Sequence, residues 1–478
     1  MKAIDNIRES FKTRQVKYGG YAALITLGVI IGLIFLNLMV EQLSPQVDLT
    51  YSGLFSLSEQ TVQVLETVNT PVKFYGLWRP GEEDSTMMDV INLYLSKNRN
   101  ITLELIDPDR NPGFVMRYDR ERRGITRGSL IVEGDKGFRV IAPVDMYDFT
   151  QTQQGGSSVT GVSVERRITS ALLYAGTGEI SVVYELTGHS EIPLSAYSLQ
   201  DTLDRENFSL ASLNLLISDI PQDASAIIMN CPARDLTSDE ADKLLDYLDK
   251  GGRIMVIADY SIMELTNLNV VLASYGLEYN YGVIIETDPY YVAIDPRTEW
   301  PDLADHDITR LLMDKSRTPV VLFDAMPLSQ LETRRRTVEI TPLMTTSPSA
   351  FLRIDLYESS PTRVPADIPG PFMIGVAVID PSWIQGDEPQ ARIVAIGGGT
   401  LLSLAVQGFD ANRDIFMNSL TWLQDRPENI TVRSKSLYLL PLRMNLVQII
   451  IFGVLFIFVF PMAFFIAGFV TWLRRRHL

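Results

Sequence analysis

The stretch Ala226–Asp259, AIIMNCPARDLTSDEADKLLDYLDKGGRIMVIAD, decides the fold of this chain. It opens with an apolar segment, Ala226–Asn230, that has the length and composition of a buried strand. A helical pattern over Asp239–Asp249 stops at Gly251-Gly252, an ordinary C-terminal helix signal. A second apolar strand, Arg253–Ala258, follows at once. Two strands joined by a crossover helix predict a parallel sheet with helices on its faces.

The same alternation continues on both sides of this unit. Ser238 is the expected N-cap of the helix that begins at Asp239. Residues 287–370 are richer in proline and charge, and we expect them to decorate the edge of the sheet. The further strands are expected at Ile180–Leu186, Phe208–Leu213, Phe372–Ile379 and Arg392–Ile396, and the further helices at Pro193–Arg205 and Arg413–Leu423.

A separate module is predicted nearer the N-terminus. Strand patterns at Val72–Leu77 and Ile101–Ile106 flank a helical pattern at Met87–Lys97, and a hairpin follows at Ser129–Glu133 and Phe138–Ile141. This order resembles the thioredoxin-like fold. The segment after the first strand, however, reads Trp-Arg-Pro-Gly from residue 78 and lacks the cysteines of thiol–disulfide exchange. We therefore expect a structural or binding module.

Two apolar runs, Tyr18–Val40 and Leu446–Leu473, bracket everything else. Each is long enough to cross a hydrocarbon core of about 30 Å as a helix. A cleaved signal peptide is the alternative for the first run, but the run is too long and Asn37–Gln46 offers no small-residue cleavage site. Basic residues flank both runs on their outer sides, which predicts that both termini are cytoplasmic. These residues are Lys2, Arg8, Lys12, Arg14 and Lys17 at one end and Arg474, Arg475 and Arg476 at the other.

Composition excludes several classes of function. The formal net charge is −16, and an acidic outer region argues against nucleic acid as a partner. The chain has 1 cysteine and 3 histidines, without paired spacing, so we expect no disulfide, no metal and no cofactor. No G-x-x-x-x-G-K-[ST] motif occurs, so the chain is not itself an ATPase of the P-loop class. Gly397-Gly398-Gly399 lacks the lysine and indicates a tight turn rather than a phosphate loop.

Four phrases in order resemble one family. They are FSLSEQT at Phe55–Thr61, TGHSE at Thr187–Glu191, a third made of IPQDA at Ile220–Ala224 with DLTSDE at Asp235–Glu240 and GGRIMVIAD at Gly251–Asp259, and NRDIFMNSLTWL at Asn412–Leu423. Together they resemble the GldG-like auxiliary subunits of ABC-2-type transport systems, known from gliding motility. The family's usual glycine in the second phrase is Ser190 here, so we expect that turn to be altered. The resemblance implies a polytopic permease and a cytoplasmic ABC ATPase as partners, and an outer domain similar to a class I amidotransferase sheet without an established active site.

Ligands of open parallel sheets bind beyond the carboxyl ends of the strands. The polar residues expected there, which define a candidate crevice, are Thr187, Gly188, His189, Glu191, Cys231 and Asp259. A Cys231–His189 nucleophile pair is one interpretation. Against it, Pro232 follows Cys231 and no nucleophile elbow presents the thiol, so a buried structural cysteine and a histidine that bridges the turn are the preferred interpretation.

Two other features suggest contacts. The tyrosines between Tyr275 and Tyr291 could line a sugar or peptide groove or simply pack a hairpin. Gly28 and Gly32 form a G-x-x-x-G pattern that allows close helix approach, and Pro461 is expected to kink the second membrane helix. These three residues are the candidate packing sites for a permease, with lipid-facing helices as the alternative.

The sequence thus predicts a non-enzymatic auxiliary subunit of an ABC-2-type transporter in the bacterial inner membrane, with its bulk outside the cytoplasm and in contact with the bilayer. The outer domain would bind, gate or relay motion. The alternatives are an anchored amidotransferase-like hydrolase and an anchored glycan or peptide receptor. The expected α/β organisation is: tail 1–17, membrane helix 18–40, thioredoxin-like module 41–150, linker and bridging helix 151–179, mostly parallel Rossmann-like domain 180–440, membrane helix 446–473 and tail 474–478.

Overall fold

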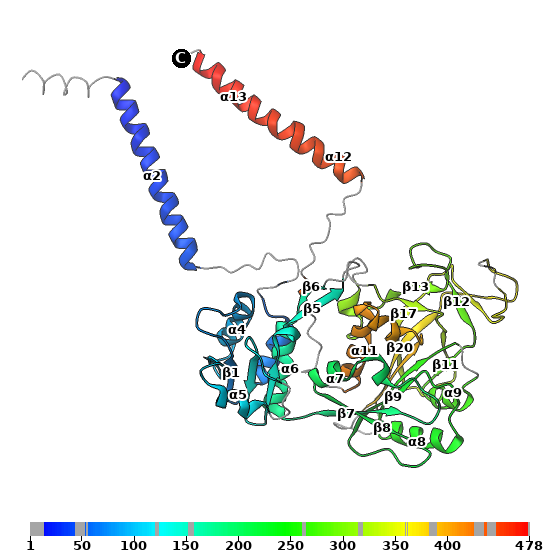
Figure 1. Ribbon diagram of the computed structural model, residues 1–478. Helices are drawn as coiled ribbons and strands as arrows, with labels where there is room; N and C mark the ends of the chain where they lie inside the picture. Colours follow the sequence, from blue (N-terminus) through cyan, green and yellow to red (C-terminus); the bar gives the residue numbers. More distant parts are fainter. Residues whose placement is uncertain are drawn as a thin grey trace, which may run out of the picture. The chain divides into compact units, whose positions relative to one another are not determined.

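The structure is a computed structural model that describes residues 14–43, 53, 56–119, 124–151, 157–260, 264–313, 319–358, 360, 362–381, 390–424, 435–436 and 446–476 (Figure 1). Contacts divide the chain into two units, Met1–Ser56 and Leu57–Leu478. The first unit is described as one helix, α2 (Arg14–Leu43). Its apolar part, Leu24–Met39, exposes its side chains throughout.

The second unit ends in a long apolar helix. It comprises α12 (Leu446–Val454), a π-helical turn at Leu455–Val459 and α13 (Phe460–Arg476). Within the described residues, Ile450–Arg474 is the one helix long and apolar enough to cross a membrane by length and composition. The wide turn ends at Val459, two residues before Pro461, and a proline has no N–H to donate to the helical ladder. The predicted second membrane helix is therefore present as a helix of sufficient length and apolar character. The apolar part of α2, Leu24–Met39, is shorter and does not meet the same criterion.

Four strands and four helices form the N-terminal module, drawn in blue to cyan in Figure 1. The strand order is β2-β1-β3-β4, with β1 parallel to β2 and β3 antiparallel to both β1 and β4. The strands are β1 (Val72–Gly76), β2 (Ile101–Leu105), β3 (Leu130–Glu133) and β4 (Phe138–Ile141), and the helices are α3 (Glu59–Thr67), α4 (Ser85–Lys97), α5 (Pro112–Tyr118) and α6 (Val164–Thr177). The strands and the hairpin expected from the sequence are present to within a residue or two.

Helix α6 is the most deeply buried of the four helices described in this module, and several of its buried side chains are polar. The hydroxyl of Tyr94 donates to the carbonyl of Glu165 at 2.9 Å, and the backbone N–H of Ser58 donates to the Glu165 carboxylate at 2.7 Å. These bonds tie α3 and α4 to α6 and satisfy groups that would otherwise be costly to bury. A hairpin, β5 (Tyr147–Gln151) and β6 (Ser157–Val162), leads into α6, and β22 (Lys435–Ser436) pairs with β6.

The larger body is built on a 10-stranded sheet. Its path runs β11-β16-β20-β21-β10-β9-β7-β8, and β17 pairs with both β14 and β20. Only the run from β21 to β8 is parallel; every pair on the β20 side is antiparallel. The strands are β7 (Ser181–Leu186), β8 (Phe208–Leu213), β9 (Ala224–Asn230), β10 (Arg253–Ala258), β11 (Leu277–Tyr279), β14 (Asp302–Leu303), β16 (Leu328–Gln330), β17 (Glu339–Thr345), β20 (Met373–Asp380) and β21 (Ala391–Gly397).

This arrangement corrects two expectations. The sheet is mixed α/β as predicted, but it is parallel in one half only. Residues 287–370 do not decorate its edge, because β14, β16 and β17 are strands of the sheet itself. The small sheets of this region are β12 (Val283–Ile285) with β18 (Phe351–Arg353) and β19 (Ile368–Pro369), and β13 (Thr298–Glu299) with β15 (Leu322–Phe323).

Helices cover both faces of the sheet, because side chains alternate between the faces along each strand. On one face, Ile228 packs in a cluster with Phe416 and Leu420 of α11. On the other, Ile227 packs with Leu244 of α8. The helices of the first face include α7 (Gln200–Arg205), α10 (Leu401–Val406) and α11 (Asp410–Leu423), those of the second α8 (Ser238–Asp249) and α9 (Thr266–Ala273), and short 3-10 turns lie at Pro143–Met146 (η1), Leu194–Tyr197 (η2) and Arg310–Leu312 (η3).

Two local expectations were wrong. Helix α8 is capped by Thr237, not Ser238: the Thr237 hydroxyl and the Glu240 carboxylate form a capping box with each other's backbone N–H groups. The helix expected over Pro193–Arg205 is split into η2 and α7, because Ser198 between them has a left-handed backbone with φ 52°. Such a residue ends one helical segment before the next begins.

Candidate functional site

The candidate crevice lies where the parallel strands end. Because β7, β9, β10 and β21 are successive neighbours, the residues that follow them meet at one edge of the sheet. The carbonyl of His189 accepts from the N–H groups of Ala233 and Arg234 at 2.8 and 3.0 Å. The thiol of Cys231 lies 3.7 Å from the carbonyl oxygen of Gly399. The structure thus brings together the residues that the sequence placed there.

The turn after β7 is built on Thr187 and Gly188. Both the N–H and the hydroxyl of Thr187 donate to the carbonyl of Leu213, at 2.8 and 3.1 Å. Gly188 has φ 125°, and Ser190 has φ 60°, a left-handed conformation that favours glycine. The backbone therefore takes the glycine conformation although a serine occupies that position.

His189 is buried between two carboxylates. Its Nδ1 lies 2.9 Å from Glu191 Oε1 and its Nε2 lies 3.0 Å from Glu240 Oε2. The bond to Glu191 raises the pKa of His189; burial opposes the rise and Glu240 adds to it. A protonated imidazole with both N–H groups bonded has no lone pair left to act as a base.

Glu240 is the partner that sequence reasoning missed. The same oxygen that faces His189 accepts from the N–H and hydroxyl of Thr237, at 2.9 and 2.8 Å. His189 therefore joins the turn after β7 to the N-terminus of α8. The spacing Thr237-x-x-Glu240 is a capping-box signature. This pattern in the sequence could have identified Glu240 as a residue of the helix N-terminus.

Cys231 is buried, with 3% of its surface exposed. Burial raises the pKa of its thiol to about 12, and the Asp259 carboxylate adds to the effect. The sulfur lies 3.5 Å from Asn230 Oδ1 and contacts the Gly399 carbonyl, whereas the two ring nitrogens of His189 bond to Glu191 and Glu240. A thiol in this state is protonated at neutral pH and is a poor nucleophile.

Gly397, the last residue of β21, and Gly399, two residues further along, allow close packing. A Cβ at Gly397 would overlap the carbonyl oxygen of Met326, which belongs to the chain beside β21. A Cβ at Gly399 would lie 2.7 Å from Cβ of Asp259. No side chain fits at either place, so the tight turn expected from the sequence needs no phosphate ligand to explain it.

The tyrosines of the predicted groove do not gather on one surface. Tyr275 and Tyr279 are core residues, and the Tyr279 hydroxyl donates to the carbonyls of Val256 and Ile396 at 3.2 and 3.1 Å. Tyr290 is 85% exposed. An aromatic groove built from this stretch is therefore not present in the described residues.

The N-terminal module carries charge where a thioredoxin carries cysteines. Trp78, directly after β1, is buried, and Arg79 pairs with Asp109 at 2.7 Å. Arg127 pairs with Asp109 at 2.7 Å and with Glu82 at 3.2 Å. All four charged side chains are largely exposed, so the pairs contribute little stability. Among the described residues no group of three or more His, Cys, Asp or Glu could hold a metal ion.

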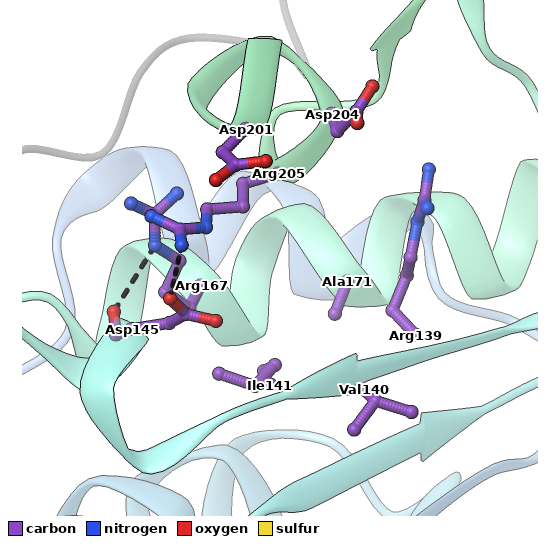
Figure 2. A pocket seen from close by; sticks show the side chains of 9 residues that line it. All are labelled: Arg139, Val140, Ile141, Asp145, Arg167, Ala171, Asp201, Asp204 and Arg205. Carbon is purple, nitrogen blue, oxygen red and sulfur yellow. Dashed lines mark hydrogen bonds and ion pairs between the residues drawn. The ribbon is translucent and has the colours of Figure 1, made fainter. Parts of the chain in front are cut away.

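A cavity that no motif indicated lies next to helix α6 (Figure 2). It has a volume of about 210 Å³ and is lined by residues of β4, η1, α6 and α7. Three of these residues are arginines, Arg139, Arg167 and Arg205, which lie far apart in the sequence.

Comparison with solved structures gives only distant likenesses. The structure named "mmIFT52 N-terminal domain" is 18% identical and matches with a TM-score of 0.37, over 51% of this chain and 98% of that one. A ThuA-like protein from Parabacteroides merdae is 12% identical with a TM-score of 0.29, over 52% of this chain and 91% of that one. The exo-β-1,4-mannosidase Op5Man5 from an Opitutaceae bacterium is 10% identical with a TM-score of 0.26, over 71% of this chain and 48% of that one.

Sequence comparison is more informative. None of the curated proteins matches the chain. Residues 174–424, which make up more than half of the chain and include the crevice, match the model of one family. The chain therefore belongs to the family described as "ABC-type uncharacterized transport system", whose members are auxiliary components of such systems.

Proposed function

We propose that this chain is a non-enzymatic auxiliary subunit of an ABC-2-type transporter, and that its outer domain binds, gates or relays motion from a permease and a cytoplasmic ATPase. The observation that supports the proposal is the state of the crevice. The cysteine among the described residues of the crevice is a buried thiol, and the neighbouring histidine is held between two carboxylates. A family of transport auxiliaries with such a crevice fits a mechanical role better than a catalytic one.

The proposed organisation keeps the borders drawn from the sequence. Residues 41–150 would form a thioredoxin-like module without redox chemistry, 151–179 a linker and bridging helix, and 180–440 a Rossmann-like domain with an antiparallel extension. The strand order β2-β1-β3-β4 supports the first assignment, and the parallel run from β21 to β8 supports the last.

Both terminal helices would anchor the chain in the bacterial inner membrane and contact the permease. Gly28 and Gly32 lie on α2, and a Cβ added at either would meet nothing within 4 Å. Pro461 lies at the start of α13, behind the wide turn. Small residues on an uncovered helix allow a partner helix to approach closely. ATP-driven motion of the permease could then shift the anchors and the attached body.

Co-purification tests the proposal directly. The full chain, extracted from its own membrane in mild detergent, should bring down a polytopic permease and an ABC ATPase. The double change Gly28→Leu with Gly32→Leu should reduce their yield, because the added side chains block close approach, whereas Val29→Leu on the same helix should not. Recovery of the chain without either partner, after cross-linking as well, would refute the auxiliary role.

The hydrolase alternative has one observation in its favour. Cys231 has φ 51° at the end of β9, a strained conformation of a kind that occurs at functional sites. If the thiol has no chemical role, iodoacetamide at pH 8 should leave it unmodified in the folded chain and modify it after unfolding. Cys231→Ser should leave transport by the whole complex unchanged. Loss of activity in that variant, with normal assembly, would favour the enzyme.

A further inference from the structure

The cavity beside α6 contains side chains of both charges. Arg139 of β4, Arg167 of α6 and Arg205 of α7 line it, together with Asp145, Asp201 and Asp204 (Figure 2). The remaining lining is apolar. Its volume of about 210 Å³ suits a small ligand rather than a drug-sized one.

One end of the cavity holds paired charges. Arg205 Nη2 lies 2.7 Å from Asp145 Oδ1, and Arg167 Nε donates to the Asp145 carbonyl at 3.3 Å. Arg167 Nη1 donates to Glu206 at 2.9 Å. Burial, and then the like charge of Arg166, lowers the pKa of Arg167 to about 10. The arginines at this end are thus already paired with acids, and Arg167 owes its lowered pKa first to burial.

Arg139 differs from the other two, because no carboxylate pairs with it in the described part of the chain. Its Nε donates to Asn207 Oδ1 at 3.2 Å, and its guanidinium lies over the ring of Tyr174 at 4.0 Å from the centroid. Asn207 is itself fixed, since its Nδ2 donates to the carbonyl of Ser170 at 2.8 Å. The guanidinium is thus oriented by two neighbours, and both terminal nitrogens are left for a ligand.

Carboxylates on α7 supply the opposite charge. Asp204 accepts from Gln200 at 3.2 Å, and Asp201 is exposed. Their negative charge disfavours a polyanion, while an oriented guanidinium favours a carboxylate, which it can bind through two parallel hydrogen bonds. A ligand with one carboxylate and one ammonium group satisfies both requirements.

We propose that this cavity binds a small zwitterion, a free α-amino acid or a short peptide, with its carboxylate on Arg139 and its ammonium group near Asp201 and Asp204. The site would give the outer domain a ligand of its own, at a place that α6 and α7 share. The inference does not depend on the proposed transporter role, because binding is measured on the isolated full chain.

Calorimetric titration of the full chain in detergent, at constant ionic strength, tests the site. Glycylglycine and L-alanine are the zwitterionic probes, and acetate, methylammonium and inorganic phosphate are the comparison set. At least one zwitterion should bind saturably and more tightly than acetate or methylammonium. Arg139→Gln should weaken that binding about 10- to 100-fold, the range expected for loss of a charged, bidentate hydrogen bond.

Two further variants keep the result interpretable. Asp201→Asn changes an exposed side chain and should weaken the binding of the zwitterion about two- to fivefold without weakening the binding of acetate. Arg99→Gln, at an exposed position after α4, should change the binding of neither the zwitterion nor acetate. The proposal is wrong if no zwitterion binds saturably up to about 10 mM, if Arg139→Gln binds as the native chain does while remaining folded, or if phosphate binds through Arg139 more tightly than either zwitterion.

Discussion

Ser190 is a single residue in a backbone conformation that its side chain opposes. Its φ of 60° places Cβ close to the following carbonyl, which costs about 1–2 kcal/mol for a residue other than glycine. The turn is held by contacts on both sides of Ser190, because His189 and Glu191 are bonded to each other. The rest of the turn therefore imposes the strain on this one position.

Replacement of Ser190 by glycine should stabilise the chain. Glycine relieves the left-handed strain, and this gain exceeds the free-energy cost of the greater freedom of glycine in the unfolded chain. We expect the free energy of unfolding to rise by about 0.5–1 kcal/mol. Thermal unfolding in detergent, followed by tryptophan fluorescence, measures it. Ser96→Gly, in the last turn of α4 (Ser85–Lys97), should instead destabilise the chain, by up to about 0.5 kcal/mol. A loss of stability in Ser190→Gly would show that the serine side chain makes a contact that matters more than its backbone.

His189 should give the fold a dependence on pH. Its pKa is raised above the ordinary 6.5, so its stabilisation is complete below that pH and is lost as the pH rises through the raised pKa. For Glu240, burial opposes the shift, but the bonds from Thr237 and His189 outweigh it and lower the pKa below 4.5, so its contribution is lost only in more acidic solution. The pair should stabilise most between these limits.

The variant His189→Gln should therefore lower the free energy of unfolding by about 3 kcal/mol at pH 6, because it leaves a buried carboxylate without its cation. At pH 9 the loss should be smaller. Denaturation midpoints across this range measure the difference. His306→Gln is the matched control with the opposite sign. Burial lowers the pKa of His306. The stability that depends on a neutral His306 is therefore lost as the pH falls. A cost for His189→Gln that is the same at pH 6 and pH 9 would contradict a charged imidazole.

Strand β21 illustrates how an element depends on a glycine. The carbonyl of its last residue, Gly397, accepts from the N–H of Met326 at 2.8 Å, and a Cβ at Gly397 would overlap the backbone of the same methionine. Gly397→Ala should destabilise by about 2–4 kcal/mol, since the obstacle is backbone and cannot rotate away. Gly113→Ala, in α5, where nothing lies within 4 Å of the added Cβ, should be neutral or slightly stabilising. Equal stability of the two variants would remove the packing explanation for Gly397.

Elements whose signals are local were predictable from the sequence. Helix α8 has an apolar period, a cap and a terminal glycine, and only its cap was misplaced by one residue, because Thr237 and Ser238 can both cap and Glu240 decides between them. The meeting of His189, Cys231 and Asp259 at one edge of the sheet was predictable because neighbouring parallel strands end there, whereas ligand binding at that edge stays a prediction. Both features depend on residues close in sequence or on a general rule of sheets.

Elements defined by distant partners were not predictable. Strand β17 owes its place to pairs such as Ile340 with Val378, and β14 is only two residues long. The cavity beside α6 was missed for the same reason, because Arg139, Arg167 and Arg205 share no spacing and meet only when β4, α6 and α7 pack. Tertiary contacts, rather than local pattern, create these features.

In the molecule as a whole, exposed apolar side chains are concentrated near the two ends of the sequence. The described side chains of Leu24–Met39 are exposed, as are nearly all of those in Ile450–Arg474. So much uncovered apolar surface would be insoluble in water and needs lipid or partner helices to cover it. Among the described residues, the body between them exposes no comparable apolar run. The body is also strongly acidic, because the tails 1–17 and 474–478 each carry +3 and the rest of the chain therefore carries −22.

Basic segments that flank membrane helices stay in the cytoplasm. The charge pattern therefore predicts that both tails are cytoplasmic and that the body lies outside the cytoplasm. Single cysteines in a Cys231→Ser background can test it with a membrane-impermeant maleimide, on cells whose outer membrane, where one exists, has been opened. Tyr357→Cys, at a position 98% exposed, should be labelled at once, whereas Lys2→Cys should be labelled only after the inner membrane is opened. The native chain, with buried Cys231, should stay unlabelled in both conditions and serves as the control. Labelling of Lys2→Cys in intact cells, or protection of Tyr357→Cys, would place the body on the other side of the membrane and exclude an extracytoplasmic role.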